Sequence, residues 1–343
     1  MRMINATLIK AYAKELGIDE IHITSAQPFA DAAEKILEQK NAKLYLDTEH
    51  WQKRNIEKFC NVQSVFPQAR AIIAACQCYL TDEKSDLSEP GNPHGLIARY
   101  TWRNHYVDLK KKLKKLGQLI KQKIPVSYYA SSNGPVAEKP IAQRSGIGYY
   151  GKHSIIINQS FGSWIVLGTL IVDIDIEPDR PLTIDCGNCQ KCIEMCPTKA
   201  IIAPYIIDRR RCIQALTNWY GVIPQDIVRV WGNRLYGCTI CQDVCPANEH
   251  VESRAPKTNL GTVGPSLPLL KILSMEELEY RKKYSCNQIT ANWIDFNAIR
   301  RNAIIALGHI RDKVALPLLQ KLSSDNDDVM AKTAQWACTN FDN

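Results

Sequence analysis

The sequence lacks a long hydrophobic run. Its best apolar stretch, Trp164 to Val172, is nine residues long and contains a glycine and a threonine, whereas a transmembrane helix needs about 18 to 20 apolar residues. The N-terminal segment MRMINATLIKAYAKELG also lacks the apolar block and small-residue cleavage site of a secretion signal. Its apolar residues recur at helical spacing among lysines and glutamates. We therefore expect no membrane span, and a first helix in a cytoplasmic protein.

A cytoplasmic chain is not expected to contain structural disulfides, because its compartment is reducing. The sequence nevertheless has 13 cysteines, and eight of them lie between Cys186 and Cys245. Clustered thiols in such a chain indicate metal binding. The segment from Cys186 to about Asn248 has too few periodic apolar residues to fold by hydrophobic burial alone, so metal is expected to hold it together. The remaining cysteines lie in apolar or helical contexts and are expected to be small core residues: Cys60, Cys76, Cys78, Cys286 and Cys338.

The spacing of the eight clustered cysteines matches a bacterial ferredoxin. The first four form a C-x2-C-x2-C-x3-C-P run, in which three thiolates bind one cubane cluster and the fourth, before proline, binds the other. The second four end in the same x3-C-P pattern. Ferredoxin-type exchange of ligands gives two 4Fe-4S clusters: Cys186, Cys189, Cys192 and Cys245 for cluster 1, and Cys196, Cys212, Cys238 and Cys241 for cluster 2.

A pair of zinc sites is the competing interpretation, since four thiolates also bind zinc. Zinc motifs usually come as paired C-x2-C elements, and a single zinc site leaves the third and fourth cysteines and the following proline without a role. We therefore favour iron–sulfur clusters. Two neighbouring clusters conduct single electrons, so an adjacent domain is expected to hold the electron acceptor.

The chain divides into three predicted domains. Residues 1–177 alternate helical and strand-like segments, with a buried strand at 71–80, a lysine-rich helix, and strands at 154–158 and 163–176. Residues 178–250 are the two-cluster module, and 251–343 are a helical tail with helices at 266–284 and from 297 onward. In this tail Ala303 and Ala334 are in register at a period of 31, which indicates HEAT-like repeats. The predicted fold class is an α/β domain joined to a ferredoxin-like module and a short helical repeat.

The chain is basic, with 43 Lys and Arg against 35 Asp and Glu and a net charge of +8. This excess favours a polyanionic partner, because neutralising phosphates releases counterions. A merely basic protein is an equally common explanation.

Several segments resemble the cobalamin-dependent epoxyqueuosine reductases, and the resemblance extends over almost the whole chain. They are the glycine-rich segment 142–152 (AQRSGIGYYGK), the Gly162-Ser163 pair, the eight cysteines, the NRLYGC segment at 233–238, and the Arg301-Asn-Ala triplet. That family uses base-off cobalamin and two 4Fe-4S clusters to remove the epoxide oxygen of epoxyqueuosine at the wobble position of tRNA, and reductive dehalogenases share its catalytic core.

The resemblance implies a set of cofactor and partner sites. The residues that would line the corrinoid are His153, Ile156, Gly162, Ser163 and Gln214. No histidine lies in the Asp-x-His-x-x-Gly motif expected of a protein that ligates cobalt through histidine. Electrons would come from a flavodoxin or ferredoxin. A tRNA anticodon arm would bind to basic residues at 110–112, 114, 115, 209–211, 281–283, 300 and 301.

Three polar positions depart from the family pattern. Ser132 stands where the family has an aspartate thought to protonate the substrate, six residues before Glu138. The family sequence Asp-Tyr-His is replaced by 105–107 (His-Tyr-Val), and a family arginine is Lys139. We expect either a proton donor relocated to His105 or Tyr106, or a different substrate. A surface role for His105 is the simpler alternative.

Two further functions remain open at this stage. The first is a paralogue that keeps corrinoid and clusters but reduces a small molecule or another corrinoid protein. The second is an electron carrier or binding protein without substrate chemistry.

Overall fold

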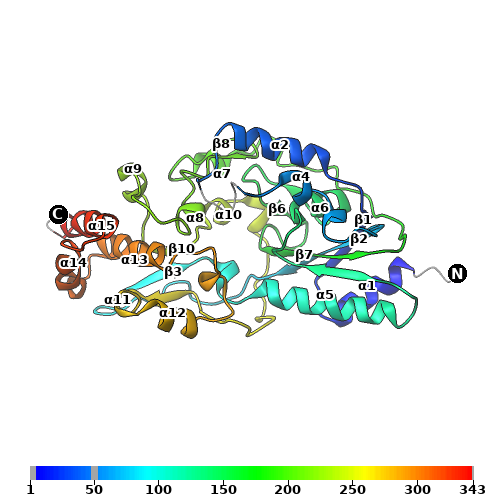
Figure 1. The fold of residues 1–343 in the computed structure, drawn as a ribbon. Helices are drawn as coiled ribbons and strands as arrows, with labels where there is room; N and C mark the ends of the chain where they lie inside the picture. Colours follow the sequence, from blue (N-terminus) through cyan, green and yellow to red (C-terminus); the bar gives the residue numbers. More distant parts are fainter. Residues whose placement is uncertain (1–4, 48–52, 342–343) are drawn as a thin grey trace.

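The computed structural model describes residues 5–47 and 53–341 (Figure 1). Its largest sheet has four antiparallel strands in the order β1-β2-β7-β4, and these strands span Glu20–Ser25, Ala71–Cys78, Ile165–Val172 and Tyr128–Ser131. Every residue of β2 is buried, as the apolar stretch at 71–80 predicts for a central strand. The strand predicted at 163–176 is β7.

Helices cover both faces of this sheet (Figure 1). One face carries α1 (Ala6–Glu15) and α5 (His105–Lys121), and the other carries α2 (Ala30–Asn41), α4 (Ile56–Phe59) and α6 (Glu138–Ser145). The apolar stripe of α5 is fully buried against the sheet: Leu109, Leu113, Leu116 and Ile120. Its 3.6-residue period explains why the lysines between these positions face outward. The strand predicted at 154–158 is only the two-residue β6 (Ile156–Ile157), paired with β5 (Tyr149–Tyr150).

The cysteine-rich segment consists of short elements. They are α7 (Lys191–Glu194), β8 (Ile201–Ala203), β9 (Ile206–Ile207), α8 (Ile213–Leu216), α9 (Gln225–Val228), β10 (Arg234–Tyr236) and α10 (Ile240–Asp243). Residues between 213 and 231 form a small apolar core of their own around the fully buried Trp231, completed by Ile305 of the tail. Part of this segment therefore has more hydrophobic support than its sequence indicates.

A second sheet joins all three predicted segments. Strand β3 (His94–Ile97) pairs in parallel with β10 of the cysteine-rich segment and antiparallel with β11 (Ser266–Pro268) of the tail. The segments thus share main-chain hydrogen bonds, and in Figure 1 α8 and α10 lie between the large sheet and the tail. The helix expected from residue 266 begins only after this strand, at Leu269, because residues 266–268 are used to pair with β3.

The described part of the tail, up to residue 341, contains five α-helices: α11 (Leu269–Ser274), α12 (Glu277–Lys283), α13 (Phe296–Ile310), α14 (Leu316–Leu322) and α15 (Asp328–Thr339). Helices α13 and α15 pack together, with Ala303 and Ala334 both fully buried, as the repeat predicts. Short 3-10 turns lie at Val62–Ser64, Arg99–Thr101, Pro246–Asn248, Gln288–Thr290 and Lys313–Ala315. None of the helices within 5–47 and 53–341 is long and apolar enough to cross a membrane.

Two expectations need correction. Cys60, Cys76 and Cys78 are buried as expected, but Cys286 is exposed, at a left-handed φ of 62° in a turn, and Cys338 is only half-buried. Arg301 was expected on the tRNA-binding surface and is instead fully buried. It donates hydrogen bonds to the carbonyls of Leu216, Trp219 and Gly221, so it ties α13 to the cysteine-rich segment.

Candidate iron–sulfur and substrate site

The fold places Cys245, which is distant in the sequence, next to the cysteines of the first motif. Burial and then the neighbouring Cys186, Cys245 and Cys189 raise the pKa of Cys192 to about 11. Burial also raises the pKa of Cys245, with added contributions from Cys186 and Cys189. Cys245 therefore lies with the first three cysteines, although more than fifty residues separate it from them.

The second group contains the other four cysteines. Burial, followed by Cys238, Cys212, Cys192 and Cys196, raises the pKa of Cys241 well above its usual value. Cys196 also acts on Cys238, and Cys238 acts on Cys212. Because Cys192 of the first group influences Cys241, the two groups are neighbours.

The donor chemistry of both groups fits a cubane, which binds four thiolates through four different irons. Among the described residues, no three His, Cys, Asp or Glu side chains could hold a single metal ion. The main chain already supports one ligand position, since the backbone N–H of Ala200 lies 3.3 Å from the sulfur of Cys196 and donates to it. Such an N–H···S contact stabilises a thiolate.

Gln214 connects the second thiol group to a cluster of tyrosines. Its Nε2 donates to the hydroxyl of Tyr100 at 2.8 Å, and its Oε1 accepts from the backbone N–H of Cys238 at 3.2 Å. Burial raises the pKa of Tyr100 to about 12, and the nearby Cys212 adds to this effect. The ring of Tyr100 lies 6.5 Å from those of Tyr106 and Tyr236. Tyr106, at the start of α5, is thus connected to the second thiol group through Tyr100 and Gln214.

Gly162 and Ser163 lie where the large sheet meets the end of the cysteine-rich segment. Gly162 has a φ of 54°, and a Cβ there would lie 2.0 Å from Oδ1 of Asn248, so only glycine fits. The backbone N–H of Ser163 donates to that same oxygen at 2.7 Å. The hydroxyl of Ser163 accepts from Gln242 and Asn248. These groups bind the two segments together, and sequence reasoning missed their partners Gln242 and Asn248.

His153 and Ile156 lie at the β5–β6 hairpin, and both are buried. Nδ1 of His153 accepts from the N–H of Ile155, whereas its buried Nε2 has no partner among the described residues. Burial, helped by Lys139, lowers the pKa of His153 to about 4, so its imidazole is neutral at neutral pH. An unpartnered imidazole nitrogen fits the amide-rich rim of a corrinoid.

Lys139 is an exposed side chain with an unusually desolvated ammonium. Nζ donates to the carbonyl of Ser154 at 2.7 Å, and burial lowers its pKa to about 8. Cys241 and Cys212 are close enough to oppose this shift. Lys139 therefore lies within electrostatic reach of the second thiol group.

The structure shows the surroundings of the predicted proton donors and of Ser132. His105 is buried rather than on the surface, with an unpartnered Nδ1 and a pKa lowered to about 4 by burial. Burial raises the pKa of Tyr106 well above its usual value, and Tyr100, Tyr79 and Glu138 add to that rise. Ser132 donates its hydroxyl to the carbonyl of Leu167 at 2.6 Å. The two candidate acids, His105 and Tyr106, are both weak proton donors in this environment, and Ser132 does not replace the aspartate of the family pattern.

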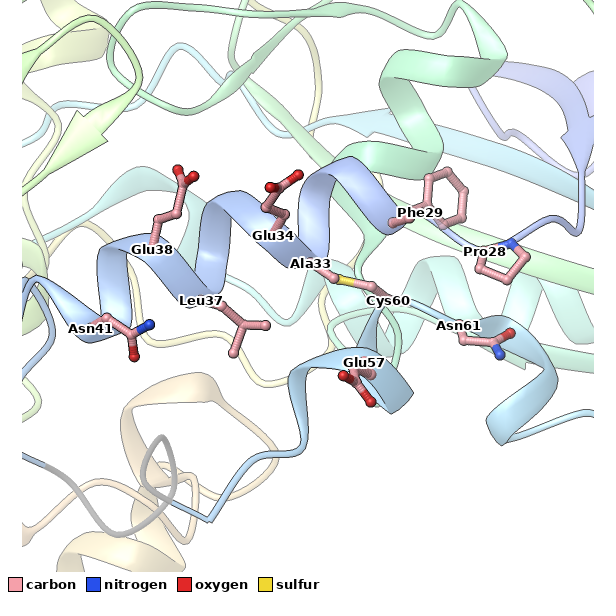
Figure 2. Close-up of a pocket in the computed structure, with 11 residues that line it drawn as sticks. Pro28, Phe29, Ala33, Glu34, Leu37, Glu38, Asn41, Glu57, Cys60 and Asn61 are labelled. Carbon is pink, nitrogen blue, oxygen red and sulfur yellow. The ribbon is translucent and has the colours of Figure 1, made fainter.

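A cavity of about 540 Å³ lies between α2 and α4 (Figure 2). Figure 2 shows Ala33 and Leu37 of α2 beside Cys60, which follows α4, and Glu57 on α4 itself. None of the predicted site residues lines it. Its carboxylates (Glu34, Glu38 and Glu57) would repel phosphate, so it is unsuited to bind a nucleic acid backbone.

Comparison with known proteins shows what this architecture is. Residues 185–248 match the model described as "4Fe-4S double cluster binding domain", residues 60–132 match "Epoxyqueuosine reductase QueG, DUF1730", and residues 299–325 match "PBS lyase HEAT-like repeat". A mixed α/β domain with a double 4Fe-4S module and a HEAT-like tail defines an iron–sulfur oxidoreductase.

Full-length relatives give the particular family. The epoxyqueuosine reductase of Bacillus cereus is 33% identical, covering 95% of this chain and 86% of the relative, and that of Vibrio cholerae is 34% identical, covering 89% and 83%. A crystal structure of epoxyqueuosine reductase with an epoxyqueuosine-modified tRNA-Tyr stem loop is 31% identical, with a TM-score of 0.88 over 98% of this chain and 90% of the other. The chain belongs to the epoxyqueuosine reductase family.

Proposed function

We propose that this protein reduces epoxyqueuosine to queuosine in tRNA, in the cytoplasm. The proposal is supported by one observation: two adjacent groups of four thiols lie next to a polar site rich in tyrosines. The chain also matches epoxyqueuosine reductases over nearly its whole length. Removing an epoxide oxygen as water consumes two electrons and two protons. The double-cluster module accounts for electron delivery, and the site at α5 and α6 has to bind and protonate the substrate.

We further propose a division of roles among three domains. Residues 178–250 hold the clusters through the two sets of cysteines, and residues 251–343 brace this module through α13. Residues 1–177 hold base-off cobalamin, which when bound supplies strongly reducing cobalt chemistry. His153 and Ile156 would contact the corrinoid from the β5–β6 hairpin, with Gly162 and Ser163 supporting it from β7 and Gln214 from the module.

The proposed nucleic acid partner is the anticodon arm of tRNA, and the proposed electron donor is a flavodoxin or ferredoxin. The exposed cations available for phosphate contacts are Lys111, Lys114, Lys115, Lys282 and Lys283. Arg210 is also exposed, but Asp208 already pairs with its guanidinium at 2.8 Å. Arg301 is excluded because it is buried. Lys112 is held by Gln77 and Asp108 at 2.7 and 2.8 Å, so it is less available than its neighbours on α5.

A direct assay tests this function. Anaerobically reconstituted protein, loaded with iron, sulfide and cobalamin and then chemically reduced, is mixed with a tRNA stem loop that carries epoxyqueuosine. Nucleoside mass spectrometry is expected to show conversion to queuosine, and protein without cobalamin serves as the control. No queuosine from protein with full cluster and cobalamin content would reject the proposal.

One second candidate function has a specific observation behind it. The hydroxyl of Ser132 is engaged by Leu167, and Val107 and Lys139 also differ from the family pattern. These changes favour a paralogue that keeps the cofactors and reduces a different small molecule or a corrinoid protein. In that case the assay yields no queuosine, but introducing Asp at Ser132 together with Lys139→Arg and Val107→His raises the yield.

A further inference from the structure

The reaction needs an acid near neutral pH, and the described residues restrict the choice. A neutral imidazole such as that of His105 cannot donate a proton readily. The hydroxyl of Ser132 is too weak an acid and is already bonded to a carbonyl. Tyr106 holds its proton tightly, so it can pass a proton on only if another group replaces that proton at once.

Glu138 has the geometry of a neutral carboxylic acid. It is the first residue of α6, and its Oε2 accepts the backbone N–H of Asn133 at 3.0 Å. Its Oε1 is shielded from solvent and has no hydrogen-bond partner in the described part of the chain. A protonated carboxyl has one oxygen that accepts and one hydroxyl that donates. Oε2 already serves as the acceptor, so Oε1 is left as an unused donor.

The surroundings of Glu138 explain why it keeps a proton. Burial raises its pKa to about 8, against the lowering effects of the backbone N–H groups of Asn133 and Gly134 and of Lys110. Lys110 lies one turn after Tyr106 on α5. No ion pair between Glu138 and a cation occurs among the described residues. Below pH 8 the carboxyl is therefore mainly protonated.

The loop before α6 is built to hold this carboxyl. Asn133 has a left-handed φ of 53°, which directs its N–H to Glu138. A Cβ at Gly134 would lie 2.0 Å from the hydroxyl of Ser131, so a larger residue there would force that hydroxyl to move. The side chain of Asn133 also reaches Gln288 of the tail at 3.4 Å. The loop is thus fixed from both sides.

We propose that Glu138 supplies the proton for the departing epoxide oxygen, passing it through the hydroxyl of Tyr106, which contacts the substrate. Tyr106 is half-buried, and its hydroxyl makes no hydrogen bond within the described residues. In this structure Oε1 of Glu138 has no hydrogen-bond partner among the described residues, so the transfer requires this carboxyl and the hydroxyl of Tyr106 to come into hydrogen-bond contact when the substrate binds. The inference rests on the proposed function.

The step balances in atoms and charge. Tyr106 gives its proton to the oxygen and receives one from Oε1 of Glu138, which becomes a carboxylate. The two electrons come from the reductant of the proposed function. A second proton, from solvent, completes water, and solvent later returns the proton to Glu138.

The test combines kinetics with a spectroscopic titration. Glu138→Gln keeps an oxygen for the N–H of Asn133 but has no acidic proton. In the reduced holoenzyme we expect its kcat/KM for the epoxyqueuosine stem loop to fall about 100-fold or more, with iron content and cobalamin spectrum unchanged. Wild-type kcat/KM should decline as the pH rises through about 8, because the protonated form is active, and this decline should be absent in Glu138→Gln. Glu34→Gln, an exposed glutamate on α2, is the matched control and should behave as wild type.

Two further measurements distinguish a failure of this proposal from a failure of the proposed function: a rescue variant and infrared spectroscopy of the carboxyl. Asp introduced at Ser132 should restore part of the activity of Glu138→Gln. In wild-type protein a protonated-carboxyl band should disappear as the pH rises through about 8, and Glu138→Gln should lack it whether or not substrate is turned over. Full activity of Glu138→Gln, or no such band in wild type, overturns the proposal. If the band is present but wild type converts no epoxyqueuosine, the proposed function fails, and with it the substrate assigned to this proton.

Discussion

The large sheet and the cysteine-rich module are stabilised in different ways. The sheet has a continuous apolar core, in which every residue of β2 and the whole stripe of α5 are buried. The module has short helices, eight thiols and a small apolar core that Ile305 completes from the tail. Its junctions are polar, made by Arg301, Asn302 and Asn248. A hydrophobic core tolerates many substitutions, whereas the loss of one cluster thiol or one buried polar group removes an interaction that no neighbour replaces. Single substitutions should therefore affect the two regions very differently.

The largest difference is expected from cysteine variants. Cys196→Ser should abolish cluster 2 and leave cluster 1, lowering iron from about eight to about four per chain, because each cubane needs its four thiolates. The large sheet should keep its structure. Iron and sulfide analysis, with circular dichroism, measures both effects. Cys338→Ser, outside the two thiol groups, is the control and should retain all iron. Loss confined to cluster 1 in Cys196→Ser would reverse the ligand assignment.

The next effect concerns the buried arginine of the tail. Arg301→Leu leaves the carbonyls of Leu216, Trp219 and Gly221 without their donor, so we expect a loss of about 3 to 5 kcal/mol in the free energy of unfolding. Urea denaturation of the holoprotein measures this. Arg300→Leu should cost under about 1 kcal/mol, because Arg300 is half-buried and makes one long side-chain bond of 3.4 Å to Asn297. Equal losses in both variants would show that Arg301 does not hold the junction.

Acidification should weaken the sheet region through its buried histidines. The pKa values of His105 and His153 are lowered to about 4, whereas unfolded histidine titrates near 6.5. Below pH 6.5 these histidines are protonated in the unfolded chain but remain neutral in the folded chain. Their contribution to the free energy of unfolding is therefore fully present above pH 6.5 and is lost as the pH decreases toward 4. Each histidine contributes up to about 3 kcal/mol to this loss. Denaturation of His105→Gln at pH 7 and pH 5 should show a smaller difference than wild type. An unchanged difference would mean that His105 is accessible to protons in the folded state.

The sequence predicts the features that depend on local pattern. The α5 stripe, the buried strand β2 and the repeat of Ala303 and Ala334 follow from short periodicities. Pairing of β3 with both β10 and β11 could not be predicted, because nothing local to residues 94–97 specifies partners so far along the chain. The burial of Arg301 could not be predicted, because its hydrogen-bond partners are backbone carbonyls and no residue type in the sequence identifies them. Glu138 was seen only as an acidic position. Its unpartnered oxygen depends on a loop turn that the order of residues does not reveal.

The smallest expected effect is a change in the salt dependence of tRNA binding, which tests whether α5 or the cysteine-rich module contacts the tRNA. Each phosphate contact contributes about 0.7 to 0.9 to the slope of log K against log salt. Lys114 and Lys115 on α5 are exposed, so the double variant Lys114→Gln/Lys115→Gln should lower that slope by about one to two if α5 contacts the anticodon arm. Lys112→Gln is the matched control on the same helix and should change the slope little, since Gln77 and Asp108 already hold its ammonium. Arg210→Gln makes the same test on the cysteine-rich module. Fluorescence anisotropy of a labelled stem loop across a salt series measures all four proteins. A slope lowered only by Arg210→Gln would place the tRNA on the module rather than on α5. A slope equal to wild type in the double variant would exclude α5, whereas an unchanged slope in Arg210→Gln leaves the module open, since Asp208 already pairs with Arg210.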